Sequence, residues 1–174
     1  FYTLAFIVAK APNNPTATWG GDHPVSQRWL LPEINSIRKT GGEAMISLGG
    51  ANGTPLATAH KTPEQLQAAY QKVIDIYGLT HIDFDVEGHW LAEAKSIERR
   101  SRAIAGLQRQ AKRANRTLHV WYTLPVLPAG LTREGLAVLR SGLRHAVVIA
   151  GVNVMAMDYG RANAPQPTTH MGTY

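Results

Sequence analysis

One octapeptide in the middle of the chain alternates acidic and apolar residues, and it limits the possible folds more than any other stretch. It runs from His81 to Gly88 and reads His-Ile-Asp-Phe-Asp-Val-Glu-Gly. Because side chains alternate between the two faces of a β-strand, Asp83, Asp85 and Glu87 would share one face. The opposite face would be wholly apolar, which predicts a strand with one side in the protein core.

Three carboxyl groups on one face of a central strand are costly to bury unless they are hydrogen-bonded or protonated. Crowding disfavours their joint ionisation, so we expect the pKa of at least one to rise, as in a general acid that stays protonated near neutral pH. Glu87 comes last, at the carboxyl end of the strand, where α/β barrels carry their chemistry. Two other interpretations remain open: acids on an exposed edge strand, and a site for a divalent metal ion.

Strand-like and helix-like segments alternate along the rest of the chain. Strands are expected over 1–9, 44–48, 81–87, 118–126 and 147–157, the first as a buried parallel strand. Helices are expected over 32–39, 63–77, 96–114 and 132–144. Segments 10–25 and 161–174 are rich in Pro, Asn, Gly and Thr and are expected to be loops. The alternation predicts a parallel sheet with helices outside, in a single domain over 1–174.

Local signals mark several ends of these elements. Three hydroxyl residues are expected to be helix N-caps: Thr62, Ser96 and Thr132. Gly78 is expected to end the second helix. Pro125 cannot donate to a sheet ladder, so its strand should finish near Thr123 or Leu124.

The composition is that of a globular domain, with 44% hydrophobic and 17% charged residues. There is no cysteine, so disulfides and thiol chemistry are excluded, and no apolar run is long enough for a membrane span. No signal peptide precedes the first strand, but a start inside a strand predicts missing N-terminal sequence. The net charge is +6, and the basic stretch from Arg99 to Arg116 lacks interleaved aromatics, which favours a solvated helix face over nucleic-acid binding.

At the acidic strand the sequence resembles a known family. Asp83-Phe84-Asp85-Val86-Glu87 is similar to the D-x-x-D-x-D-x-E signature of glycoside hydrolase family 18, the chitinases. The first Asp of that signature falls at Thr80 and the usual following Gly at His81. Other stretches resemble family motifs in the same order along the chain: Trp19-Gly20-Gly21, Ser47-Leu48-Gly49-Gly50, Thr123-Leu124-Pro125 and Met157-Asp158-Tyr159.

The resemblance implies hydrolysis of β-1,4 linkages between N-acetylglucosamine units, with substrate-assisted retaining catalysis. Glu87 would protonate the glycosidic oxygen and later act as the base, while the substrate's own N-acetyl carbonyl attacks the anomeric carbon. Asp85 would orient the acetamido N–H. Asp83, deeper and hydrogen-bonded to Asp85, would tune the proton distribution of the pair. Tyr159 would donate its hydroxyl to the acetamido oxygen, and Asp158 would accept hydrogen bonds from sugar or water.

Further substrate contacts are implied for Met157 and for the glycine pair Gly49 and Gly50, where the backbone can turn tightly. Two tryptophans, Trp19 and Trp90, are candidate sugar-stacking platforms, and each could equally be packed into the protein. No metal and no cofactor are implied. The implied partner is chitin or N-acetylglucosamine oligosaccharides, with no nucleic acid and no membrane, and the implied location is secreted.

The resemblance also implies a TIM (β/α)₈ barrel, which takes about 250 residues. This chain has 174 residues, and its five strands match the second to sixth of the barrel. We therefore expect a partial barrel with about five parallel strands, outer helices and open edges that invite self-association. Three other functions stay open: a chitinase-like lectin or inactive fragment, an endo-β-N-acetylglucosaminidase acting on N-glycans, and a metal-dependent hydrolase.

Overall fold

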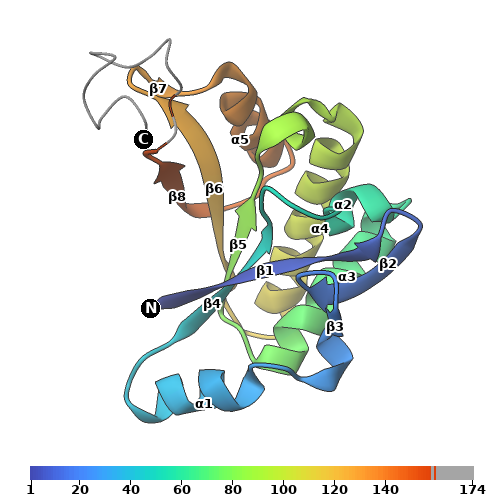
Figure 1. Cartoon of the computed structure of the whole chain (residues 1–174), viewed down its shortest axis with the longest axis vertical. Coiled ribbons are helices and arrows are strands. Elements are labelled where there is room, and N and C mark those ends of the chain that lie inside the picture. Colours follow the sequence, from blue (N-terminus) through green and yellow to red (C-terminus); the bar gives the residue numbers. More distant parts are fainter. Residues whose placement is uncertain (158, 160–174) are drawn as a thin grey trace.

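Five parallel strands lie side by side in the order in which they occur in the sequence, as Figure 1 shows. They are β1 (Tyr2–Ala11), β4 (Ala44–Gly49), β5 (His81–Asp85), β6 (His119–Leu127) and β8 (Ile149–Met155). The computed structural model describes residues 1–157 and 159 of the chain. Sequential parallel order is the topology of a (β/α)₈ barrel, and within the described residues the sheet stays open. The predicted partial barrel with five parallel strands is thus confirmed.

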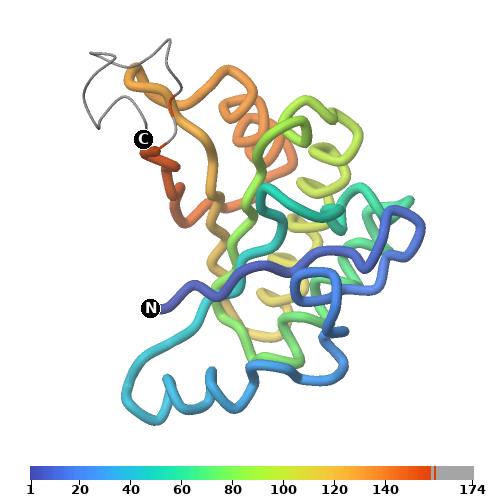
Figure 2. Tube along the Cα trace, in the orientation of Figure 1, coloured from blue at the N-terminus to red at the C-terminus, as the bar shows by residue number. Residues whose placement is uncertain are grey.

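Helices connect the parallel strands, and Figure 2 shows the chain passing from each strand to the next through a helical segment. The α-helices are α1 (Leu31–Lys39), α2 (Leu56–Ala59), α3 (Pro63–Tyr77), α4 (Ala94–Arg113) and α5 (Arg133–Arg144). Two short 3₁₀ helices are η1 (Val25–Gln27) and η2 (Gly88–Ala92). Helices α3 and α4 pack against each other on one side of the sheet (Figure 1).

Two of the three predicted N-caps are confirmed. The hydroxyl of Thr62 accepts a hydrogen bond from the N–H of Gln65, and that of Thr132 accepts one from Gly135. The third prediction is wrong, because α4 already begins at Ala94, directly after η2. Ser96 lies inside the helix, where its Oγ donates to the carbonyl oxygen of Glu93.

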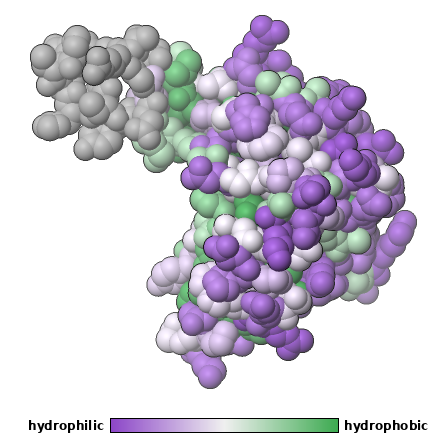
Figure 3. Space-filling model, turned by 45° about the vertical axis from the view of Figure 1, so that its right-hand side comes forward, coloured by the Kyte–Doolittle hydropathy of each residue, from purple (hydrophilic) through white to green (hydrophobic). Residues whose placement is uncertain are grey.

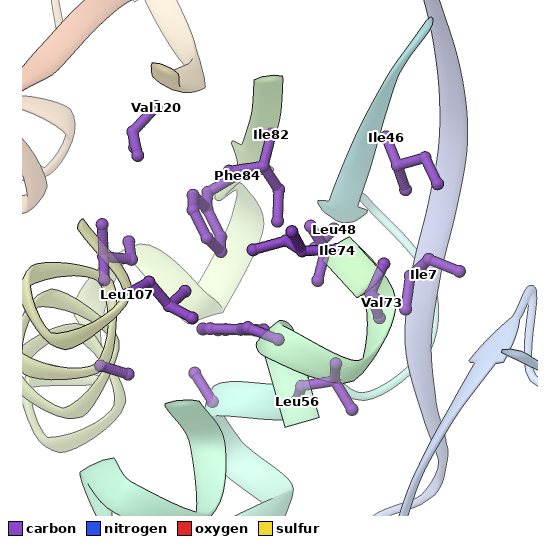
Figure 4. Close-up of a cluster of buried hydrophobic side chains, with 14 of the residues drawn as sticks. Ile7, Ile46, Leu48, Leu56, Val73, Ile74, Ile82, Phe84, Leu107 and Val120 are labelled. Atoms are coloured by element: carbon purple, nitrogen blue, oxygen red, sulfur yellow. The ribbon is translucent and has the colours of Figure 1, made fainter. Parts of the chain in front are cut away.

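The hydrophobic core lies between the sheet and these helices. Figure 4 shows Ile82 and Phe84 of β5 directed at side chains of the helical layer, including Ile74 and Leu107. The Phe84 ring is 1% exposed and packs edge-on against Tyr70. Burial of each such side chain contributes roughly 1.5–3 kcal/mol. The apolar face of the acidic strand is therefore the core face, as its alternation predicts.

A hairpin occupies most of the segment that was expected to be a loop. Strand β2 (Asn14–Trp19) runs antiparallel to β1, and β3 (His23–Pro24) pairs with β2. The loop prediction for 10–25 is wrong: Pro12, Asn13, Gly20 and Gly21 lie at the bends, whereas the Asn, Pro and Thr residues of 14–19 belong to β2. The apolar side chains of Ala17 and Trp19 are buried.

Strand β6 extends beyond its predicted end at Thr123 or Leu124. Pro125 is the last residue that pairs with β8, so the proline does end the parallel ladder. The strand itself continues, because Val126 and Leu127 pair antiparallel with β7 (Gly130–Leu131).

Both margins of the sheet are open within residues 1–157 and 159. Residues 2–5 of β1 pair only with β4, and β8 pairs only with β6. Large exposed apolar side chains lie at these margins: Phe1, Tyr2, Phe6, Val148, Val154 and Met157. Figure 3, in which the helical side comes forward, is dominated by hydrophilic residues, with apolar ones gathered beside the grey atoms. The prediction that the first strand is buried along its whole length is therefore wrong, because the first half of β1 lies at a margin of the sheet.

Among the described residues, no helix combines the length and the apolar character needed to cross a membrane.

Candidate active site

Two rows of side chains cross the inner face of the sheet near the carboxyl ends of the strands. One row, in register on β4, β5, β6 and β8, is formed by Gly49, Asp85, Thr123 and Asn153. The row below it is formed by Ser47, Asp83, Trp121 and Gly151. Since side chains alternate along a strand, both rows face away from the core that Phe84 enters.

Asp83 is 1% exposed and is held from both neighbouring strands. Ser47 Oγ donates to its Oδ2 at 2.6 Å, and Thr123 Oγ1 lies 3.0 Å from each of its carboxylate oxygens. Burial raises the pKa of Asp83, whereas hydrogen bonds from Ser47, Thr123 and Asn153 oppose that rise. The expected hydrogen bond to Asp85 is wrong, because these hydroxyl groups occupy the oxygens of Asp83 instead.

Asp85 has a different environment. It is 8% exposed, and its buried Oδ1 has no hydrogen-bond partner among the described residues. Burial, the negative charges of Glu87 and Asp83, and a hydrogen bond with Glu87 raise the pKa of Asp85 to about 8. Asp85 is therefore mostly protonated at neutral pH, which confirms that crowding raises the pKa of at least one acid of the strand.

Glu87 lies two residues beyond the end of β5, at the start of η2. Its backbone is extended and its side chain is half-buried. The preceding residue, Val86, is buried, and its N–H donates to the carbonyl oxygen of Thr123 at 3.1 Å. This bond fixes the chain just before Glu87 and keeps the third acid on the same side as Asp85.

The glycine pair closes β4 against the acidic strand. Gly49 has a φ of +116° and Gly50 one of +89°, both in the region that favours glycine. The N–H of Gly50 donates to the carbonyl oxygen of Asp85 at 3.3 Å. A Cβ atom on Gly49 would overlap that same oxygen. The pair therefore allows a close approach of two backbones, and its contact with substrate stays a prediction.

The two tryptophans have different surroundings. Trp19 is 2% exposed, and its Nε1 donates to the hydroxyl of Tyr77 at 2.7 Å on the helical side of the sheet. The proposed sugar-stacking role of Trp19 is wrong. Its ring is buried and packs edge-on against Tyr77 of α3, so neither face of the ring is open to a sugar. Trp90 is half-buried on η2, lies against the tilted ring of His89 and packs against the core, and its role stays a prediction.

The motif after β8 is described only in part. Met157 is 48% exposed and Tyr159 is half-buried, whereas Asp158 lies outside the described residues. The roles of all three stay predictions. In the part of the chain that the structure describes, no group of three or more His, Cys, Asp and Glu side chains is arranged to hold a metal ion.

The histidine before the acids lies at the opposite end of β5 from Glu87. The ring of His81 stacks on that of His119, with centroids 4.4 Å apart, and its Nδ1 is 2.9 Å from the hydroxyl of Thr80. Thr80 and His81, the two departures from the family signature, therefore contact each other rather than the carboxyl groups above them.

Sequence reasoning missed the contacts that Thr123 and Asn153 make around Asp83. Asn153 Nδ2 donates to Thr123 Oγ1 at 3.2 Å, which links β8 to the acidic strand through β6. The available signal was modest: Asn153 is the one polar side chain in the otherwise apolar or glycine stretch 147–157. A half-buried polar group among apolar residues of a strand usually has a hydrogen-bond partner, and here that partner belongs to the site.

Comparison with known proteins points to one class of enzyme. Over 161 residues, 92% of this chain, the sequence is 43% identical to the probable bifunctional chitinase/lysozyme of Escherichia coli K12, of which it spans 18%. The catalytic domain of the hyperthermophilic chitinase from Pyrococcus furiosus matches with a TM-score of 0.77 and 33% identity. That match covers 93% of this chain and 52% of the other. No family model matches the sequence.

A family 18 chitinase catalytic domain from the fern Peteris ryukyuensis has the same fold, with a TM-score of 0.60 at 17% identity. The match covers 92% of this chain and 59% of that domain, so the chain spans little more than half of each solved domain. Sequence, fold and the order of the motifs agree with one another. The chain is thus similar to chitinases over 92% of its length, and it shares the fold of a family 18 catalytic domain.

Proposed function

We propose that this chain carries the catalytic centre of a chitinase that hydrolyses β-1,4 linkages between N-acetylglucosamine units. The observation that carries the proposal is the row of acids on β5, with Asp83 held by hydroxyl groups and Asp85 poorly solvated beside Glu87. Such pairs of carboxyl groups with unlike environments are typical of acid–base catalysis. The names of its relatives support the same reaction class.

In this proposal Glu87 is the general acid and base. It gives a proton to the glycosidic oxygen while the carbonyl oxygen of the substrate's N-acetyl group attacks the anomeric carbon, and the bond to the leaving sugar breaks. Water then attacks the same carbon and gives a proton to Glu87 while the bond from that carbon to the N-acetyl oxygen breaks, with net retention. Asp85, the neighbour of Glu87, holds a proton at neutral pH and orients the acetamido N–H.

The remaining predicted contacts surround this pair. Tyr159 donates its hydroxyl to the acetamido oxygen, and Asp158 accepts hydrogen bonds from sugar or water. The other proposed substrate contacts are Met157, Gly49, Gly50 and Trp90. Since chitin is a polymer that an enzyme meets outside the cell, secretion is part of the proposal.

A second candidate function is binding of chitin oligosaccharides without cleavage. The open sheet favours it, because the described strands supply one side of a substrate site and leave the opposite side unbuilt. The chain also spans only 52% of the Pyrococcus furiosus catalytic domain.

The experiment that separates the two functions is incubation of this chain with N-acetylglucosamine oligomers, followed by mass spectrometry of the products. Glu87→Gln is the test variant. Glu93→Gln is the matched control, since Glu93 is also a half-buried acid and accepts from Thr58 at 3.3 Å. Cleavage that is lost only in Glu87→Gln supports the proposal. Undiminished cleavage by that variant contradicts it, and binding without cleavage by all three proteins selects the binding function.

A further inference from the structure

The hydroxyl group of Thr123 lies between two side chains from neighbouring strands. Its Oγ1 is 3.0 Å from each carboxylate oxygen of Asp83 on β5 and 3.2 Å from Nδ2 of Asn153 on β8. A hydroxyl group has one proton, and an amide NH₂ group can only donate. The amide of Asn153 donates to one of the two lone pairs of Thr123 Oγ1, and the single proton of Thr123 is directed at Asp83.

Asp83 thus receives donors from two sides, Ser47 on β4 and Thr123 on β6. Asp85 differs, because one of its oxygens is buried without a hydrogen-bond partner in the described structure. An ionised carboxylate gains most from several donors, and an oxygen without a donor is least costly on a protonated acid. The arrangement of hydroxyl and amide groups therefore distinguishes two aspartates that are only two residues apart.

We propose that Thr123 and Asn153 are positioning residues of the catalytic centre, which hold Asp83 in its ionised form and so leave Asp85 as the protonated aspartate. The inference deepens the proposed function and rests on it for its catalytic meaning: the proton on Asp85 is the one beside Glu87. Its geometric basis does not depend on any substrate.

The charges around the pair agree with this assignment. Glu87 and Asp83 act on Asp85, and both belong to the acidic segment itself. The neighbouring strands β4, β6 and β8 present uncharged side chains to the pair: Ser47, Thr123 and Asn153. Among residues 1–157 and 159, the difference between the two aspartates is therefore set by hydrogen bonding and burial rather than by a nearby cation.

The test is a ¹³C NMR titration of the aspartate carboxyl carbons in the substrate-free chain. The chain has five aspartates, few enough to assign by substitution. In the unaltered chain we expect Asp85 to titrate near pH 8 and Asp83 at lower pH. In Thr123→Val the midpoint of Asp83 should rise by about one to two pH units, the size expected for one hydrogen bond to a charged group. Thr123→Ser should restore it.

Asn153→Leu tests the outer link, because without the amide the Thr123 hydroxyl is free to turn away from Asp83. We expect the titration midpoint of Asp83 to rise in this variant as well. If Thr123→Val does not fold, Asn153→Leu takes its place in the test. Thr18→Val is the matched control: Thr18 is a buried strand threonine whose hydroxyl donates to the carbonyl oxygen of Val8, away from the acids. It should leave both midpoints unchanged.

Unchanged midpoints of Asp83 in both folded variants, Thr123→Val and Asn153→Leu, would overturn the inference. So would a titration of the unaltered chain in which Asp83 binds its proton at higher pH than Asp85. No substrate is present, so these results stand whether or not the chain cleaves chitin. Failure of the positioning role and failure of the chitinase proposal are therefore distinguishable.

Discussion

The carbonyl oxygen of Asp85 occupies the place where a side chain on Gly49 would begin. Two backbones meet here without a side chain between them, and the φ of Gly49, +116°, is one that other residues rarely adopt. The end of β4 is also joined to the acidic strand there, because the N–H of Gly50 donates to the same carbonyl oxygen at 3.3 Å.

Gly49→Ala should lower the free energy of unfolding by about 1–3 kcal/mol more than the same change at Gly130, because a backbone overlap adds to the strain of a positive φ. Gly130 is a suitable control, with a φ of +121° and no atom within 4 Å of an added Cβ. Urea unfolding of both variants measures the difference. Equal decreases in the free energy of unfolding would mean that the contact between Gly49 and Asp85 does not contribute to stability.

Asp85 should make stability depend on pH. Its pKa is about 8 in the folded chain against the ordinary aspartate value of 3.8, so its contribution to folding is complete below about pH 4 and is lost as the pH rises towards 8. Asp85→Asn should therefore match the unaltered chain near pH 4. At pH 9 it should melt about 5 °C higher, the shift that roughly 1–2 kcal/mol gives in a domain of this size.

Thermal unfolding at pH 4 and pH 9 checks this prediction. Asp75→Asn is the matched control, since Asp75 is exposed on α3 and accepts a hydrogen bond from Gln71. A higher melting temperature at pH 9 in the control, or no increase in Asp85→Asn, would contradict the role of burial at Asp85.

Trp19→Phe should reduce stability by about 1–3 kcal/mol, because it removes the bond to Tyr77 and leaves unfilled volume in the core. Binding of N-acetylglucosamine oligomers should not change. Trp29→Phe is the comparison, because Trp29 is 45% exposed and packs edge-on against Trp19. Calorimetric binding together with urea unfolding separates the two effects. Unchanged stability with lost binding would contradict the assignment of Trp19 to the core.

The open margins should let the chain associate with itself at high concentration. Val154→Lys places a charge on the outer strand β8, where Val154 is exposed, and should weaken this association. Leu143→Lys is the control, since Leu143 is an exposed apolar residue on α5, away from the sheet margin. Sedimentation velocity over a range of concentrations gives the measurement. A monomer at every concentration would show that the margins do not associate.

The acidic strand could be predicted because its pattern is local. Alternation at every second residue directs Phe84 into the core and Asp83 to the other face without reference to the rest of the chain. The cap at Thr62 and the left-handed glycine at Gly78 were predictable for the same reason, since each depends on a few neighbouring residues.

What the sequence did not reveal depends on distant residues. The contact between Thr123 and Asp83 joins positions 40 residues apart, and it exists only because β5 and β6 pair in one particular register. The hairpin at 10–25 was missed because a composition suited to turns outweighed the few buried residues between them. Trp19 is placed by Tyr77, 58 residues away, which no local pattern predicts.

Asp83 and Asp85 are already buried within a sheet that is still open, by neighbours on β4, β6 and β8. Most of the dehydration of the two acids is thus achieved within the open sheet. Closure of a barrel would remove little further water from them, and what it would supply is the opposite wall against which a sugar chain can be held.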